Sequence, residues 1–181
     1  MEIVLLEHLT DKEKQAAVME LLTMADQEFV PPISARTSST QMDLAPGGTG
    51  SIEAYYETIR DLPVVLALEG DRVVGFMHFR FDHTCDHITQ VPNAYACTSS
   101  VHPDGRGHGL MQKFYQAIID AYPERMVCTR TWHTNLGHLH ILNKLGFRET
   151  CCLENDRGPG IHTVYYALPP RHAAGVNAHQ A

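Results

Sequence analysis

Hydrophobic and polar residues follow two different periods along this chain, which predicts a mixed α/β fold. Apolar, β-branched runs predict strands at 2–9, 63–69, 72–83, 94–101, 124–132, 148–156 and 160–169. Apolar residues at helical spacing predict helices at 11–29, 51–61, 109–122 and 135–147. The order is strand, two helices, three strands, helix, strand, helix and two strands, which is typical of a mixed sheet covered by helices.

Local signals define several ends of these elements. Thr10 or Asp11 is expected to cap the first helix, in which Ala17, Leu21, Met24 and Phe29 approximate one apolar face. Two prolines at 31–32 stop this helix, and the stretch 31–50 is rich in breakers and hydroxyls, so we expect a loop. The sequence Glu-Gly-Asp at 69–71 indicates a hairpin.

Composition narrows the class of protein. The chain has 181 residues, 44% of them apolar and 19% charged, which suits one globular domain. A formal net charge of -7 argues against nucleic acid or an anionic membrane as the main partner. The 5 cysteines follow no repeated spacing, so we expect reduced thiols and a cytoplasmic protein. No apolar run is long enough for a membrane span, and no basic leader precedes the first strand.

The stretch 101–122, VHPDGRGHGLMQKFYQAIIDAY, places glycines directly before a helical pattern. A helix N-terminus offers unpaired N–H groups and partial positive charge, both of which favour an anion such as phosphate. Gly105, Gly107 and Gly109 let the backbone approach that anion, and Arg106 adds a cation. Taken alone, the motif is explained at least as well by a turn that merely links a strand to a helix.

A second motif gives this stretch a family context. SSVHPDGRGHGLMQKFYQAI resembles the acetyl-CoA-binding motif of the GNAT (GCN5-related) N-acetyltransferase family, Val-x-Pro-x-x-Arg-Gly-x-Gly-x-Gly/Ala. NLGHLHILNKLGF resembles the second motif of that family, Asn-x-x-Ala-x-x-Leu-Tyr-x-x-x-Gly-Phe. The resemblance covers residues 1–168 as one N-acetyltransferase domain, followed by a flexible tail at 169–181. It implies the GNAT fold, a mostly antiparallel sheet of about seven strands, flanked by helices, that opens as a V between the fourth and fifth strands.

The resemblance implies acetyl-CoA as the acyl donor and assigns residues to it. The backbone amides of 106–111 would hold the pyrophosphate, and the strand around Ser99 and Val101 would pair with the pantetheine arm, opposite the strand at 128–131. The implied cofactor-binding residues are Ser99, Val101, Arg106, Gly107, His108, Gly109, Leu110, Met111 and Asn135.

Two positions depart from the family pattern. Met111 stands where the family usually has Gly or Ala, but its N–H remains available. Leu142 stands where many members have the tyrosine that protonates the leaving thiolate, and leucine cannot donate a proton. His138 lies one turn earlier on the same helix face, so it is a candidate acid, beside the alternatives of a solvent-facing histidine and of water as the donor.

The remaining catalytic and acceptor residues are weaker inferences. Glu28 is the nearest acidic candidate for the base at the acceptor mouth, although it also fits a surface helix end. Arg36, in the loop after the prolines, is expected to contact the acceptor. His78 shares a strand face with Phe76 and either lines the acceptor pocket or lies in the core.

Twelve histidines raise the question of a metal site. His138 and His140 point about 200° apart on a helix and cannot share an ion. The segment 82–87, DHTCDH, pairs His83 and His87 with intervening polar residues, but it reads as a solvated loop between strands. We therefore expect no metal.

The sequence thus predicts an N-acetyltransferase that moves an acetyl group from acetyl-CoA to a primary amine of a small molecule, or of a peptide, by direct attack in a ternary complex. No nucleic-acid or membrane partner is expected, and a homodimer, common in the family, fits as well as a monomer. Two alternatives stay open: a non-catalytic CoA-binding module, and a metal-binding protein built on the 82–87 loop.

Overall fold

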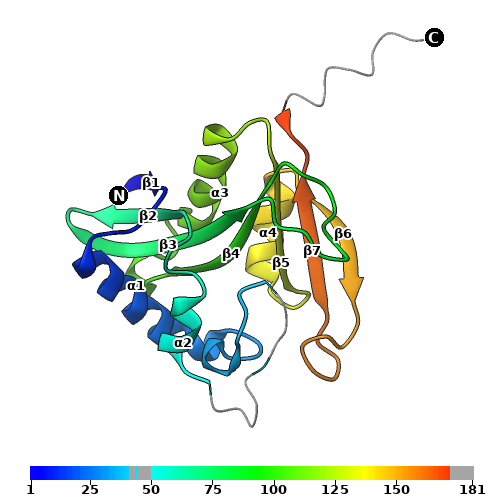
Figure 1. Ribbon diagram of the computed structural model, residues 1–181, viewed down its shortest axis with the longest axis horizontal. Helices are drawn as coiled ribbons and strands as arrows, with labels where there is room; N and C mark the ends of the chain where they lie inside the picture. Colours follow the sequence, from blue (N-terminus) through cyan, green and yellow to red (C-terminus); the bar gives the residue numbers. More distant parts are fainter. Residues whose placement is uncertain (41–43, 45–49, 172–181) are drawn as a thin grey trace.

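The computed structural model describes residues 1–40, 44 and 50–171, which form a twisted sheet with helices on both faces (Figure 1). The strands are β1 (Glu2–Leu6), β2 (Val64–Glu69), β3 (Arg72–Phe81), β4 (Asn93–Val101), β5 (Met126–Trp132), β6 (Arg148–Leu153) and β7 (Thr163–Leu168). The helices are α1 (Lys12–Ala25), α2 (Ile52–Glu57), α3 (Leu110–Ala121) and α4 (Leu136–Lys144), with short 3₁₀ turns η1 (Asp26–Glu28), η2 (Ile33–Ala35) and η4 (Pro103–Gly105).

The seven strands of the described sheet lie in the order β1-β2-β3-β4-β5-β7-β6. Neighbouring strands are antiparallel except for β4 and β5, which run parallel. The β4–β5 ladder pairs 93–96 with 126–129 and then stops, although both strands continue. The sheet therefore opens between its fourth and fifth strands, which confirms the predicted fold class.

Each face of the sheet has its own apolar core. On one face, α3 and α4 pack through Phe114, Ile118 and Leu142 against strands β2 to β5 and β7. On the other face, α1 and α2 pack through Val18, Leu22 and Tyr55 against β2 and β3. The opening between β4 and β5 thus connects two layers built from different helices.

The apolar face predicted for the first helix is wrong in part. The residues of α1 that are buried are Val18, Leu21, Leu22 and Ala25, whereas Met24 is 45% exposed. The helix ends at Ala25 and continues as η1, so Phe29 is no longer on the helix. Asp11 is the N-cap, accepting hydrogen bonds from the amides of Glu13 and Lys14.

The C-terminal tail expected at 169–181 lies largely outside the described residues. Its described part ends at Arg171, whose amide donates to Pro123 O and whose guanidinium pairs with Asp120 at 2.7 Å. None of the helices in the described ranges combines the length and apolar character that a membrane crossing requires.

His78 gives the fold a pH-dependent stability. Its ring is fully buried on β3, edge-on to Phe76, and burial lowers its pKa to about 4. The backbone at 62–63 offsets part of this effect, although neither ring nitrogen has a regular hydrogen-bond partner among the described residues. Between pH 6.5 and pH 4, His78 is protonated in the unfolded chain but stays neutral in the folded chain. The free energy of unfolding therefore falls as the pH falls from about 6.5 towards 4.

We predict that His78→Leu weakens this pH dependence. From pH 7 to pH 5 the free energy of unfolding of the parent should drop by about 2 kcal/mol more than that of the variant. Urea denaturation at the two pH values measures the difference, with His140→Leu, on the exposed side of α4, as the control. An equal drop in His78→Leu and parent would show that another group carries the acid sensitivity.

Candidate functional site

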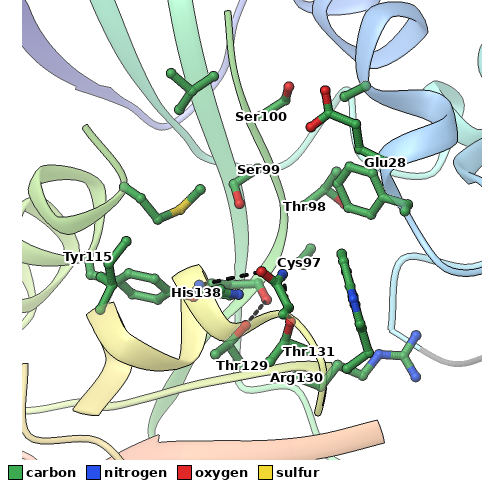
Figure 2. A pocket seen from close by; sticks show the side chains of 18 of the residues that line it. Glu28, Cys97, Thr98, Ser99, Ser100, Tyr115, Thr129, Arg130, Thr131 and His138 are labelled. Atoms are coloured by element: carbon green, nitrogen blue, oxygen red, sulfur yellow. Dashed lines mark hydrogen bonds between the residues drawn. The ribbon is translucent and has the colours of Figure 1, made fainter. Parts of the chain in front are cut away.

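A cavity of about 290 Å³ occupies the opening between β4 and β5 (Figure 2). It is lined by 97–101 of β4, 129–132 of β5, residues of η1, α3 and α4, and Arg106. Because β4 and β5 have separated here, the facing edge of each strand has backbone groups that no ladder uses. A polar, extended group can therefore enter between the two strands.

The turn before α3 has the geometry of an anion-binding turn. Gly109 is the N-cap of α3 at φ 69°, and no side chain caps the free amides of the first helical turn. Gly107 and Gly109 both have positive φ, and a Cβ added at either would meet nothing within 4 Å. The turn is thus open, and the helix N-terminus presents unsatisfied N–H groups to it, as phosphate-binding turns do.

The structure brings most of the predicted cofactor residues to this one place. Ser99, Val101, Arg106, Met111 and Asn135 line the cavity. The side chain of Leu110 is buried in the core, so only its amide is available, while Gly107, His108 and Gly109 form the exposed turn. The amide of Arg106 already donates to Pro103 O at 3.1 Å, which leaves 107–111 as the free donors.

Arg106 connects the glycine-rich turn to Glu28, the candidate base. Its guanidinium donates to Glu28 at 2.6 Å and to the carbonyl of Val101 at 3.3 Å. Both side chains of the pair are about half exposed, so the pair contributes little to stability. Glu28 also lines the cavity, so a carboxylate does stand at its mouth.

His138 lines the cavity and forms a pair with Tyr115, a residue that the sequence did not single out. The Tyr115 hydroxyl lies 2.9 Å from His138 Nε2, and the rings stack at 5.8 Å (Figure 2). Burial lowers the pKa of His138 to about 4 and raises the pKa of Tyr115, so both groups are neutral near pH 7. Leu142 is fully buried in the core and does not line the cavity.

The two residues expected to contact the acceptor do not line the cavity. Arg36 is 7% exposed, donates twice to Pro31 O at 3.0 and 2.7 Å, and lies over the Phe29 ring. His78 is fully buried on β3 beside Phe76. Phe29, Arg130 and Trp132 line the cavity instead.

Cys97 lines the cavity but is poorly suited to act as a nucleophile. Burial raises the pKa of its thiol, and the nearby Arg80, whose Nε lies 3.4 Å from the sulfur, offsets only part of that effect. A thiol with a raised pKa is mostly protonated near neutral pH and is a weak nucleophile. An acetyl-cysteine intermediate is therefore disfavoured here.

The 82–87 loop has structural contacts of its own. Asp82 pairs with Arg125 at 2.7 Å, His83 packs on Tyr95, and His87 lies on Tyr165. Among the described residues, no three His, Cys, Asp or Glu side chains are grouped so that they could hold a metal ion. The metal-binding alternative thus finds no ligand set in this part of the chain.

Comparison with known proteins agrees with this geometry. The model of the acetyltransferase (GNAT) family matches residues 34–147. A putative acetyltransferase of Salmonella typhimurium, yncA, solved with acetyl-CoA, superimposes with a TM-score of 0.61 at 20% identity over 99% of this chain and 96% of that one. No curated protein sequence matches the chain significantly.

Two further solved structures share the fold. The ribosomal-protein-alanine N-acetyltransferase of Brucella melitensis has a TM-score of 0.66 at 15% identity over 93% of this chain and 99% of that one. The ribosomal-protein-S18-alanine N-acetyltransferase of Escherichia coli has a TM-score of 0.63 at 15% identity over 99% and 100%.

The family match identifies the class of protein as an acetyl-CoA-dependent acetyltransferase. The chain belongs to the GNAT acetyltransferase family, and its acyl donor is acetyl-CoA.

Proposed function

We propose that the protein acetylates a primary amine of a small molecule, or of a peptide, by direct attack in a ternary complex. The observation that carries this proposal is the cavity between β4 and β5, which is lined by Arg106 of the glycine-rich turn and by Phe29, Arg130 and Trp132, beside which we place the acceptor. Donor and acceptor would meet in this opening, and the protonated thiol of Cys97 favours direct transfer over an acetyl-enzyme.

The reaction requires two proton movements. The amine nitrogen forms a bond to the acetyl carbon and loses a proton, while the carbon–sulfur bond breaks and the thiolate gains one. Most primary amines are protonated near pH 7, so a base at the acceptor mouth speeds attack. We assign that role to Glu28, and we assign hydrogen bonding to the leaving sulfur to the Tyr115–His138 pair.

We predict that Glu28→Gln lowers the turnover number by about a hundredfold, the usual scale for loss of a general base. The dissociation constant for acetyl-CoA should stay the same or decrease slightly, because Arg106 loses its partner and becomes free for a phosphate. Steady-state kinetics and calorimetry separate the two effects, with Glu124→Gln, away from the cavity, as the matched control. Unchanged turnover would remove Glu28 from the mechanism.

The proposal is tested by thiol release. The protein is incubated with acetyl-CoA and a panel of amines, and both substrates are varied for the amine that reacts fastest. We expect free CoA in proportion to acetylated amine, and intersecting double-reciprocal lines. Parallel lines would contradict the ternary complex.

The alternative of a non-catalytic CoA-binding module follows from the buried Leu142, which leaves the usual acid position empty. Tight binding of acetyl-CoA without thiol release from any amine in the panel would establish it. As part of the same proposal we place the protein in the cytoplasm, since all 5 of its cysteines carry free thiols.

A further inference from the structure

Four arginines from four separate segments lie near one another beside the cavity: Arg36, Arg80, Arg130 and Arg157. Arg36 lies over the Phe29 ring at 5.3 Å and Arg157 over the Trp132 ring at 5.5 Å. The two ring centroids are 5.9 Å apart, so both cations lie against one aromatic wall, formed by Phe29 and Trp132. Arg80, on β3, reaches Cys97 in the same cavity.

These guanidinium groups lack anionic partners within the described residues. Every ion pair found there uses other basic groups, and the two nearby acids form none with these arginines: Asp26 accepts from Ser34, and Asp156 accepts from Thr163. The negative charges of Asp26 and Asp156 offset only part of the effect of burial on the pKa values of Arg36 and Arg157. Burial, together with the neighbouring Arg36 and Arg130, lowers the pKa of Arg157 to about 9. Positive charge is thus concentrated here in a chain of net charge -7.

Three of the four arginines hold neighbouring segments of the chain through hydrogen bonds, whereas Arg130 has no such role among the described residues. Arg36 and Arg157 hold the carbonyls of Pro31 and Val30, and Arg80 donates to the Ser39 hydroxyl at 2.9 Å. Arg130 lines the cavity, with the Tyr165 phenol as its polar neighbour on β7. Figure 2 shows its side chain extending away from Tyr115 and His138.

We propose that the acceptor amine also carries a carboxylate, and that Arg130 binds it. The planar guanidinium of an arginine can donate two parallel hydrogen bonds to the two oxygens of a carboxylate. Arg130 is partly buried and has no carboxylate partner among the described residues, so it can bind a carboxylate in this way. Arg36, Arg80 and Arg157 add positive potential around the same wall. The inference rests on the proposed amine acetylation and narrows its substrate class.

Glu28 gives the cavity a complementary second pole. Both residues line the cavity (Figure 2): Glu28 comes from η1, where one of its oxygens accepts from Arg106 at 2.6 Å, and Arg130 comes from β5. An acceptor with an ammonium group at one end and a carboxylate at the other is therefore oriented by both. Free amino acids have this chemistry, and so do short peptides with a free C-terminus or an acidic side chain.

The test compares matched acceptors: amino acids, the same amino acids as C-terminal amides, and dipeptides with free or amidated ends. In the parent, kcat/KM should be about tenfold to hundredfold higher for each carboxylate than for its amide. Arg130→Gln should remove that preference by lowering the value for the carboxylates alone. Arg130→Lys should keep part of it, and Arg60→Gln, on an exposed position away from the cavity, should leave it unchanged.

These outcomes distinguish the carboxylate inference from the proposed amine acetylation on which it rests. Equal kcat/KM for acids and amides in the parent, or an equal loss for both in Arg130→Gln, would overturn the carboxylate assignment while leaving amine acetylation in place. Absence of turnover with every amine, despite binding of acetyl-CoA, would overturn the proposed function and this inference with it. Preference for the dipeptide acids over the free amino acids would identify a peptide as the source of the carboxylate.

Discussion

Replacing Gly109 with glutamate should weaken acetyl-CoA binding by about a hundredfold or more, because like charges a few ångströms apart repel by several kcal/mol when partly shielded from water. Gly109 is the uncapped N-terminus of α3. A carboxylate there would itself take up the free amides of the first turn and would repel the pyrophosphate from them. Calorimetric titration with acetyl-CoA measures the loss.

The control for this variant must separate charge from backbone strain. At φ 69°, any side chain with a Cβ is disfavoured, but asparagine tolerates the left-handed region and is neutral. Gly109→Asn should therefore keep most of the affinity. If Gly109→Glu folds and binds acetyl-CoA as tightly as the parent, the pyrophosphate does not lie at this turn.

Removing the His138 side chain should lower the turnover number by about tenfold to hundredfold, the range for one hydrogen-bonding group at a reacting atom, with little change in acetyl-CoA affinity. His138→Ala breaks the 2.9 Å contact with Tyr115, and Tyr115→Phe breaks it from the other side. If the two residues act as one unit, the double variant should be no slower than the slower single variant.

The pH profile distinguishes hydrogen bonding from acid catalysis by an imidazolium. An unperturbed histidine would titrate near 6.5 and produce a limb near neutral pH. Burial lowers the pKa of His138 to about 4, so the ring is neutral well above that value and we expect no limb from it near neutral pH. His140→Ala, on the exposed side of α4, is the control. Unchanged turnover in both His138→Ala and Tyr115→Phe would make water the donor to the thiolate.

Local patterns were sufficient to predict most of the fold. The Glu-Gly-Asp hairpin forms around Gly70 at φ 60°, and Asp11 caps α1, because turns and caps depend on a few consecutive residues. The exposure of Met24 could not be predicted in this way, because packing on β3 and α2 decides which side of α1 is buried.

Several cavity-lining residues could be predicted from the sequence, because one turn and one helix start supply them. Arg130 and Tyr115 could not. Arg130 is one polar residue within an apolar strand run, and Tyr115 fits the apolar face of α3. Both reach the cavity only because β4 and β5 separate after Ala96 and Thr129, which is a consequence of tertiary packing. A basic residue within a predicted strand is the signal that could have pointed to Arg130.

Transfer of a labelled acetyl group tests the central claim most directly. The protein is given acetyl-CoA with an isotope-labelled acetyl group and a mixture of amino acids and amines, and the products are identified by mass spectrometry. We predict a labelled N-acetyl product formed in step with free CoA by the parent, and its loss in Gly109→Glu. Release of CoA with the label in acetate alone, or no release at all, would contradict the account.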